Sequence, residues 1–328
     1  MFRVVDLAPG GELSVQENLE DVALPDEGTL RWVDLHGEEK SLEKLRQEYS
    51  FHPLAIEDCR VFDQRPKLEE YKDHLFLVTQ SFSTPEAGSG GQHAGLDLHE
   101  LHAFLGKNYL VTVHSSHISA LEQVRQRVID NPSLLERGVD FVYYLIASRL
   151  VEENFPILDC VTDELEEIED RVLSTPVRTD LNRIFELKRR LVLMRKVLSP
   201  QRDTMVMLAR RGDLRVSERT ALYFRDVHDQ LVRLNESIEA NRDLLSNALD
   251  AYLSAVSNRT NEIMKYLTLL SAVFLPLAFI VGFFGQNFED LPGAPQWTRS
   301  DALMYLMLTL CLATPLVMFT WFRVRRWL

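Results

Sequence analysis

Two long uncharged segments in the C-terminal part constrain the fold of this chain more than any other feature. Residues 266–284 are nineteen consecutive positions without a charge, and residues 303–322 are twenty. At about 1.5 Å per residue, each would span roughly 28–30 Å as a helix, about the thickness of a hydrocarbon core. Residues 1–14 hold no apolar run, so no signal peptide is expected. The sequence therefore predicts two transmembrane helices.

Basic residues beside these segments predict their orientation. Arg259 and Lys265 precede the first segment, and three arginines follow the second. The connecting loop carries Arg299 as its single basic residue, against three acidic ones. Because basic residues concentrate on the cytoplasmic side, we expect both termini in the cytoplasm and the loop outside.

The negative charge of the chain lies before the first apolar segment. Residues 1–265 hold 32 Lys and Arg against 46 Asp and Glu, a net charge of −14. This balance argues against binding to nucleic acid or to anionic lipid by charge, and it is compatible with attracting cations. The alternative is a soluble acidic surface with no further role. Cys59, Cys160 and Cys311 show no metal or redox spacing, so no disulfide framework is expected.

Residues 1–135 are predicted to form a mixed α/β cytoplasmic domain. Alternating apolar side chains predict strands at 29–35 and 74–82 and a hairpin over 101–114 that turns at Gly106. Residues 41–49 and 53–60 have helical character, and residues 83–95, rich in Gly, Ser and Pro, predict a loop.

Residues 136–216 are predicted to form a helical hairpin with one acidic and one basic arm. Residues 151–170 hold nine Asp and Glu and no Lys or Arg, whereas residues 181–196 hold six Lys and Arg and one Glu. A helix breaker lies between them at Pro176. Facing charges would set the register of the arms; alternatively, the acidic face points at solvent or ions.

A single long helix is predicted after the hairpin. Residues 217–275 contain no Gly and no Pro, and their apolar residues recur at steps of three and four. A helix of this length reaches roughly 90 Å, far more than a bilayer, so a stalk (217–265) must continue into the first transmembrane helix (266–285). An external loop (286–302), a second transmembrane helix (303–323) and a basic tail (324–328) complete the predicted organisation.

One face of this helix is small or polar where its surroundings are Leu, Phe, Ile and Val. At helical spacing the stripe contains Ser257, Asn261, Met264, Thr268, Ser271, Leu275, Ala278 and Gly282. A symmetric ring of such helices would enclose a pore, with Met264 and Leu275 as apolar constrictions and Asp250 as a carboxylate ring at the inner mouth. The alternative is that the hydroxyl groups bond back to helix carbonyls or pack against a neighbouring helix.

The loop after the first transmembrane helix opens with polar residues. Mg²⁺ gives up its water reluctantly, so a ring of carboxamides from Asn287 would suit its hydrated form. Glu289 and Asp290 would raise the local cation concentration, and Gly285 permits a tight turn or an exposed carbonyl. Together with Gln286, these residues are the candidate selectivity loop.

Other chemistry finds little support in the sequence. His93, His99 and His102 are interpreted as surface or loop histidines rather than a zinc site, because the spacing of the last two suits a strand site badly and no Cys accompanies them. No redox dithiol, nucleophile elbow or phosphate-binding Gly loop is present, so an enzyme is not expected.

Several motifs resemble the CorA family of magnesium channels. The stalk sequence at 252–262, its continuation to 280 and the loop Gly-Gln-Asn-Phe at 285–288 are similar to the family's stalk and Gly-Met-Asn-Phe signatures. Similarity extends to residues 52–58, 64–67 and 223–227 and to the basic C-terminal residues. Together these motifs cover most of the chain.

This resemblance implies a funnel-shaped homopentamer in a prokaryotic-type inner or plasma membrane, with an α+β cytoplasmic domain and a pore lined by the first transmembrane helix. Asn287 matches the asparagine that captures hydrated cation, and Gly282 lies lower in the pore. Asp250, Asn261, Met264 and Leu275 match pore or gate positions. Asp226 matches an acidic residue that binds regulatory divalent ions between subunits and so holds the channel closed.

The chain departs from the family pattern at three places. Gln286 replaces the signature Met, Ala278 stands where a pore Thr is common, and the acidic partner of Asp226 falls in the loop at 83–95, with Glu86 as the nearest candidate. The predicted function is therefore transport of Mg²⁺, with Co²⁺ or Ni²⁺ as further substrates. The alternatives are a proton-coupled Zn²⁺ transporter of the ZntB type, favoured by Gln286 and Ala278, and a membrane-anchored coiled-coil scaffold.

Overall fold

The computed structural model describes residues 2–19, 22–37, 39–85, 95–174, 177–210, 215–285 and 301–325. The chain divides into two compact units, Met1–Ala251 and Tyr252–Leu328. The first holds a sheet, the helices that cover it and most of a helical bundle, and the second holds the end of the longest helix and the C-terminal helix.

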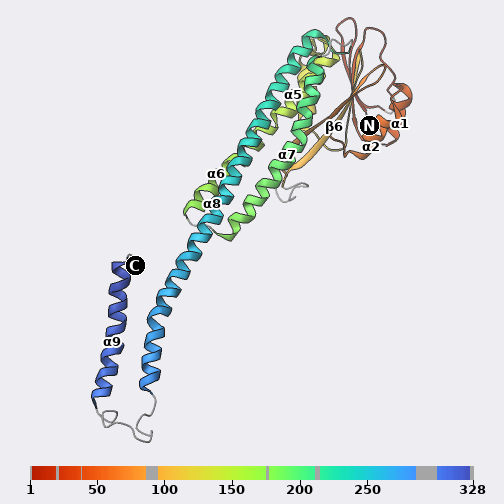
Figure 1. The fold of residues 1–328 in the computed structure, drawn as a ribbon. Helices are drawn as coiled ribbons and strands as arrows, with labels where there is room; N and C mark the ends of the chain where they lie inside the picture. The colour runs from red at the N-terminus through yellow and green to blue at the C-terminus, as the bar shows by residue number, and fades with distance from the viewer. Residues whose placement is uncertain are drawn as a thin grey trace. The chain divides into compact units, whose positions relative to one another are not determined.

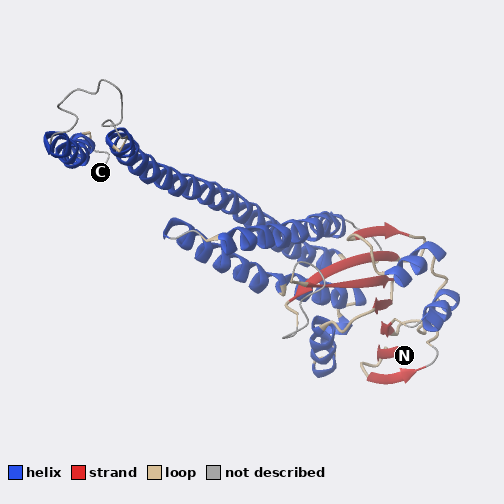
Figure 2. Ribbon diagram, turned by 90° about the horizontal axis from the view of Figure 1, so that it is seen from below, coloured by secondary structure: helices blue, strands red, loops and turns tan. Residues whose placement is uncertain are grey.

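Seven strands form one mixed sheet in the first unit (Figure 2). They are β1 (Phe2–Leu7), β2 (Leu13–Leu19), β3 (Leu30–His36), β4 (Lys67–Glu70), β5 (Leu75–Ser83), β6 (Asp97–Leu105) and β7 (Tyr109–His114). Their spatial order is β2-β1-β3-β7-β6-β5-β4. The β3/β7 pair is parallel, and the other neighbouring pairs are antiparallel.

The sequence predicted the central strands and missed others. β3, β5 and the β6/β7 hairpin are confirmed within a few residues, whereas β1, β2 and β4 were not predicted. β2 is a polar edge strand and β4 has four residues, so neither shows a strong alternation. The hairpin turns where expected: the Gly106 N–H donates to the Tyr109 carbonyl at 2.9 Å. A Cβ on Gly106 would overlap the Tyr109 ring, which explains the glycine.

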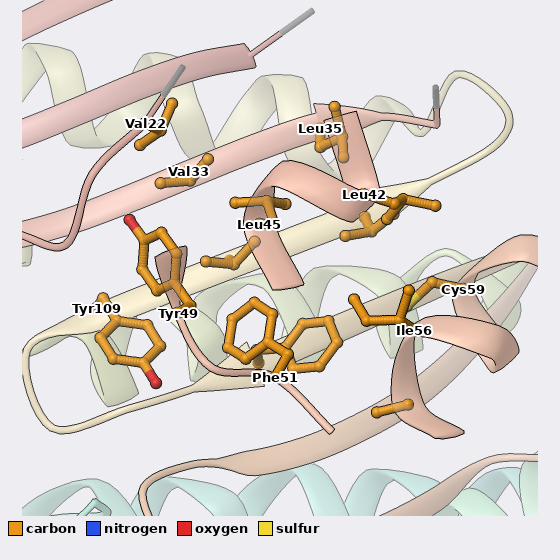
Figure 3. Packing of buried hydrophobic residues seen from close by; sticks show 14 of the residues in the cluster. Val22, Val33, Leu35, Leu42, Leu45, Tyr49, Phe51, Ile56, Cys59 and Tyr109 are labelled. Atoms are coloured by element: carbon orange, nitrogen blue, oxygen red, sulfur yellow. The ribbon is translucent and has the colours of Figure 1, made fainter. Parts of the chain in front are cut away.

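Two short helices, α1 (Glu39–Glu48) and α2 (Pro53–Val61), cover one face of the sheet and confirm the predicted helical segments. Figure 3 shows the cluster between them and the strands, with Leu42, Leu45 and Ile56 pointing toward the sheet. The Phe51 ring stacks on Phe104 of β6 with 3.9 Å between centroids. Pro53 lies in the first turn of α2, where its missing N–H costs no hydrogen bond.

The opposite face is covered by α3 (Ser119–Asp130) and α5 (Val139–Glu152), linked by the short α4 (Ser133–Glu136). α5 contacts β3, β5, β6 and β7 and is buried over most of its length. This covering of both faces explains why β5 and β7 are buried on both sides.

Three helices then form a bundle: α6 (Asn154–Ser174), α7 (Arg178–Arg210) and the first part of α8 (Glu218–Phe284), which lie side by side in Figure 1. The predicted hairpin is confirmed, and its charged arms face each other only in part, because Asp159, Asp163, Glu166 and Asp170 of the acidic arm are exposed to solvent. Glu164 pairs with Arg190 at 2.9 Å, and Arg171 pairs with Asp180 at 3.0 Å. The predicted breaker Pro176 lies outside the described residues.

α8 is one helix of 67 residues, as the absence of Gly and Pro predicted. Its apolar row is buried from Val227 to Tyr252 by the bundle, and the later members Val256 and Ile263 are exposed. Pro276 lies inside the helix without ending it. In the second unit, α9 (Asp301–Val324) follows the residues of the loop, most of which lie outside the described part of the chain.

The interpretation of the histidines as surface or loop residues is wrong for those that are described. His102 is fully buried in β6, with its Nε2 at 2.5 Å from Glu100 and its Nδ1 at 3.1 Å from the Cys59 thiol. His99 is partly buried between the Ser83 and Ser116 hydroxyls, each at 2.8 Å. A separation of three residues places the two rings on opposite faces of the strand, so they cannot form one zinc site. His93 lies outside the described residues.

Candidate functional site

The small and polar stripe of α8 is exposed along its whole length in the single chain. Its predicted members all lie on this helix, and each of them is solvent-exposed: Ser257, Asn261, Met264, Thr268, Ser271, Leu275, Ala278 and Gly282. Met264 is 55% exposed and Leu275 is 75% exposed. Large apolar side chains with this exposure are unusual on a surface in water, so we expect this face to meet another helix, lipid or a pore.

The stripe points away from the second apolar helix. In the second unit, Leu269 and Val273 of α8 line an apolar groove with Pro315, Leu316, Phe319 and Phe322 of α9. Successive residues advance about 100° around a helix, so the centre of the stripe lies roughly 150° from this α9-facing side. The neighbour that covers one side of α8 is therefore α9, and the stripe is left for something outside the chain.

Thr268 fits in part the alternative in which the hydroxyl groups of the stripe bond back to helix carbonyls. The Thr268 hydroxyl donates to the Met264 carbonyl at 2.8 Å, as expected for a helical threonine that bonds back to the helix. Its oxygen still has free lone pairs on the exposed side. Thr268 therefore has acceptor sites on its exposed side but is not a free donor.

Gly285 directly follows Phe284, the last residue of α8. Its N–H donates to the Val281 carbonyl at 2.8 Å, and a Cβ at this position would lie 2.9 Å from the same oxygen. A side chain here would therefore crowd the last turn. Gln286, Asn287, Glu289 and Asp290, the other loop candidates, lie outside the described residues, so their roles stay predictions.

The predicted regulatory acid, Asp226, is exposed on α8 in the first unit. Its Oδ2 accepts a hydrogen bond from Gln230 at 3.0 Å. Burial raises the pKa of the nearby Tyr144, and the negative charge of Asp226 adds to this shift. Its predicted partner Glu86 lies outside the described residues. Among the described residues, no group of three or more His, Cys, Asp or Glu side chains is arranged to hold a metal. The regulatory role of Asp226 therefore stays a prediction.

The sequence interpretation missed a row of carboxylates on α8. Asp229, Glu236, Asp243 and Asp250 are exposed and recur every seven residues, so they lie along one side of the helix. Asp250 was identified from its position below Asn261, but the heptad spacing of the other three was a signal in the sequence. A row of this kind attracts cations along the helix.

Comparison with known proteins identifies the family. The family model described as "CorA-like Mg2+ transporter protein" matches residues 27–326. The chain belongs to the CorA family. The putative metal ion transporter YfjQ of Bacillus subtilis is 34% identical over 297 residues, 90% of this chain and 89% of that protein. The cobalt/magnesium transport protein CorA of Thermotoga maritima is 30% identical over 311 residues, 92% and 85% of the two chains.

A solved structure supports the fold of this CorA-family chain. The CorA magnesium transporter from Methanocaldococcus jannaschii superimposes with a TM-score of 0.82 at 23% identity, covering 99% of this chain and 98% of the other. The α+β domain, the long helix and the two apolar helices predicted from the sequence are thereby confirmed.

Family and structure together establish the coarse function. CorA-family members are transporters, and this chain is a divalent-cation transporter of the membrane. Two of its described helices are long and apolar enough to cross a bilayer, the end of α8 and residues 304–324 of α9, and nearly all of their apolar surface is exposed. That exposure distinguishes them from core helices of a soluble protein.

Proposed function

We propose that this protein conducts hydrated Mg²⁺, and with it Co²⁺ or Ni²⁺, through a pore at the centre of a homopentamer in a prokaryotic-type inner or plasma membrane. The observation that carries the proposal is the exposed stripe on the side of α8 that α9 does not cover. One helix cannot enclose a pore, whereas a ring of copies would bring the same stripe to one axis.

The chemistry of the stripe suits an ion that keeps its water. Asn261 and Thr268 offer neutral hydrogen-bonding groups, and Gly282 leaves room because it has no side chain. Such a lining would hydrogen-bond the water molecules around the ion without removing them. Met264 and Leu275 would form apolar constrictions that close by excluding water. The carboxylates of the α8 row, ending at Asp250, would raise the cation concentration at the inner mouth.

We also propose that the pore is regulated by cytoplasmic divalent ions. Asp226 offers an exposed carboxylate, and Mg²⁺ prefers oxygen ligands and retains several waters. One carboxylate from each subunit, completed by a second acid such as Glu86 from a neighbour, would hold subunits together when the ion is abundant. Loss of the ion would then favour an open ring.

Flux through the purified protein in liposomes tests the proposal. We expect Mg²⁺ uptake that does not depend on a pH gradient, and its abolition by Asn287→Ala in an oligomer of unchanged size. Asn258→Ala is a matched control, because Asn258 is an exposed amide of α8 that lies off the stripe. Full Mg²⁺ uptake by Asn287→Ala would contradict the proposed selectivity loop.

The same assay separates the Zn²⁺ alternative. Gln286 and Ala278 are the residues that favour it, since both depart from the family pattern at the loop and in the pore. Zn²⁺ uptake driven by a proton gradient, with little Mg²⁺ uptake, would replace the magnesium proposal. Restoring the family residues with Gln286→Met and Ala278→Thr would then be expected to shift the preference back toward Mg²⁺.

A further inference from the structure

The outer faces of α6 and α7 carry opposite charges that the bundle does not neutralise. On α6, the exposed residues at helical spacing include Asp159, Asp163, Glu166 and Asp170, hereafter the α6 acidic face. None of these carboxylates pairs with a basic side chain within the part of the chain that the structure describes. No basic residue lies among them, so the face is a continuous negative strip.

The outer face of α7 is basic and apolar. A shallow groove there, hereafter the α7 groove, is lined by Phe185, Lys188, Arg189, Val192, Leu193 and Lys196. Phe185 is 43% exposed and Val192 is 50% exposed. Lys188, Arg189 and Lys196 form no ion pair among the described residues, whereas Arg183 and Arg190, on the inner side of the helix, pair with α6 of the same chain. The basic and apolar side chains of the α7 groove are thus available to contact a partner.

These two faces cannot meet within one chain. α6 and α7 bury Leu165 and Leu191 on their inner sides. They are also tied to α8, by the Asn241–Thr162 hydrogen bond at 2.8 Å and the Arg195–Glu239 ion pair at 2.9 Å. In a bundle of three helices the outer faces point away from one another. The α6 acidic face can therefore reach an α7 groove only on another copy.

The α6 acidic face and the α7 groove lie at matching positions along the length of the helical bundle. Glu164 pairs with Arg190 and Glu167 lies 3.7 Å from Arg183, so the antiparallel register places Asp163 level with about Arg189. By the same register Cys160, which is exposed beside the α6 acidic face, is level with about Val192. Rotation about an axis parallel to the bundle leaves heights unchanged. In a cyclic assembly whose axis runs parallel to the bundle, residues that are level within one hairpin are therefore level between neighbours.

We propose that the α6 acidic face of one copy docks into the α7 groove of the next copy. The contact is heterologous, so its repetition forms a ring when the rotation between copies closes, as in the homo-oligomer proposed above, on which this inference rests. A basic amphipathic helix also suits an anionic membrane surface. The second copy is the better occupant, because its α6 supplies acids at matching heights and because the −14 charge of residues 1–265 opposes an anionic surface.

Pairwise cross-linking tests the contact directly. One tagged variant keeps Cys160 and carries Cys311→Ser, and a second carries Cys160→Ser, Cys311→Ser and Val192→Cys; Cys59 is buried in both. After co-expression and mild oxidation in the membrane, we expect a covalent dimer that contains both tags. Such a dimer cannot arise within one chain. Glu186→Cys in place of Val192→Cys is the control, because Glu186 is exposed on α7 but lies outside the groove.

Charge reversal tests whether the contact stabilises the assembly. Asp163→Lys or Arg189→Glu alone is expected to shift the purified protein toward smaller species and to remove the cross-link. The double variant is expected to restore both. Glu48→Lys, at an exposed acid of α1 outside both faces and the α8 row, serves as the control and should leave the assembly unchanged.

Different failures point to different errors. An oligomer that ignores both reversals and gives no mixed dimer would overturn the α6–α7 contact and leave the proposed function intact. A wild-type protein that is monomeric would overturn the contact together with the homopentamer. If Arg189→Glu weakens binding to anionic vesicles but not assembly, the α7 groove faces lipid and the contact is wrong.

Discussion

The side chain of His74 shows how burial alters one residue. Its ring is buried against Phe51, Tyr71 and Phe104, with centroid distances of 4.9, 5.1 and 5.6 Å. Burial lowers the pKa of His74 from 6.5 to about 4, and the positive charge of Arg215 adds to the shift. The folded protein therefore keeps this ring neutral at a pH where the unfolded chain protonates it.

This shift predicts a loss of stability in mild acid. As the pH falls from 6.5 toward 4, the unfolded state takes up a proton that the folded state does not, so the free energy of unfolding decreases over that window. His74→Phe keeps the ring packing and is expected to flatten the pH dependence of the thermal midpoint between pH 7 and pH 5. His117→Gln, at an exposed position, should leave it as in the wild type. An unchanged slope in His74→Phe would show that another group dominates.

Among the elements, β5 depends on helices that are distant in sequence. β4 pairs with β5 only at residues 75–78, so the N–H groups of Gln80 and Phe82 lie beyond its end. The Gln201 side chain of α7 accepts from the Gln80 N–H at 2.8 Å, and Asn154 of α6 accepts from the Phe82 N–H at 3.3 Å. Both side chains are fully buried, so two helices replace the missing strand.

Removing either side-chain acceptor is expected to be costly. Gln201→Met or Asn154→Leu keeps the volume but leaves a buried N–H unpaired, which costs about 1–3 kcal/mol of stability. Chemical denaturation of the detergent-solubilised protein, followed by the fluorescence of Trp32 in β3, measures the change. Gln126→Met, on the exposed face of α3, is the control. A loss no larger than that of the control would mean that water replaces the amide.

At the scale of the whole molecule, the exposed stripe of α8 fits the proposed ring of several copies. Its stripe is exposed in one chain, although it carries side chains as apolar as Met264 and Leu275. A soluble monomer would bury such residues, whereas a ring would place them around one axis, where they repel water.

This arrangement predicts gain of function from polar substitutions. Met264→Ser and Leu275→Ser are expected to hydrate the proposed constrictions and raise Mg²⁺ flux in liposomes at high internal Mg²⁺, where the proposed regulation would close the pore. Leu270→Ser removes an equally exposed apolar side chain of α8 away from the stripe and should not raise flux. Equal effects of the three variants would indicate a general weakening of the helix in the bilayer rather than opened constrictions.

Local sequence patterns were enough to predict α1, α2, the charged arms α6 and α7 and the last two helices, whereas α3, α4 and α5 were not predicted as separate helices. The uncharged lengths of the last two helices, the absence of Gly and Pro from residues 217–275 and the charged arms of the hairpin are properties of neighbouring residues, and each predicted its element. The same holds for the motifs that identify the CorA family. The roles of Asn287 and its loop stay predictions, because that loop lies outside the described residues.

Other features were decided by tertiary structure alone, because they depend on residues far apart in the chain. The edge strands β2 and β4 exist because neighbouring strands pair with them, not because their own residues alternate strongly. The burial of His102 follows from α2 packing on β6, which no spacing of histidines encodes. That α9 covers one side of α8 and leaves the polar stripe exposed is likewise a property of packing: helical spacing places residues on a face, but only the neighbouring helix determines which face is covered.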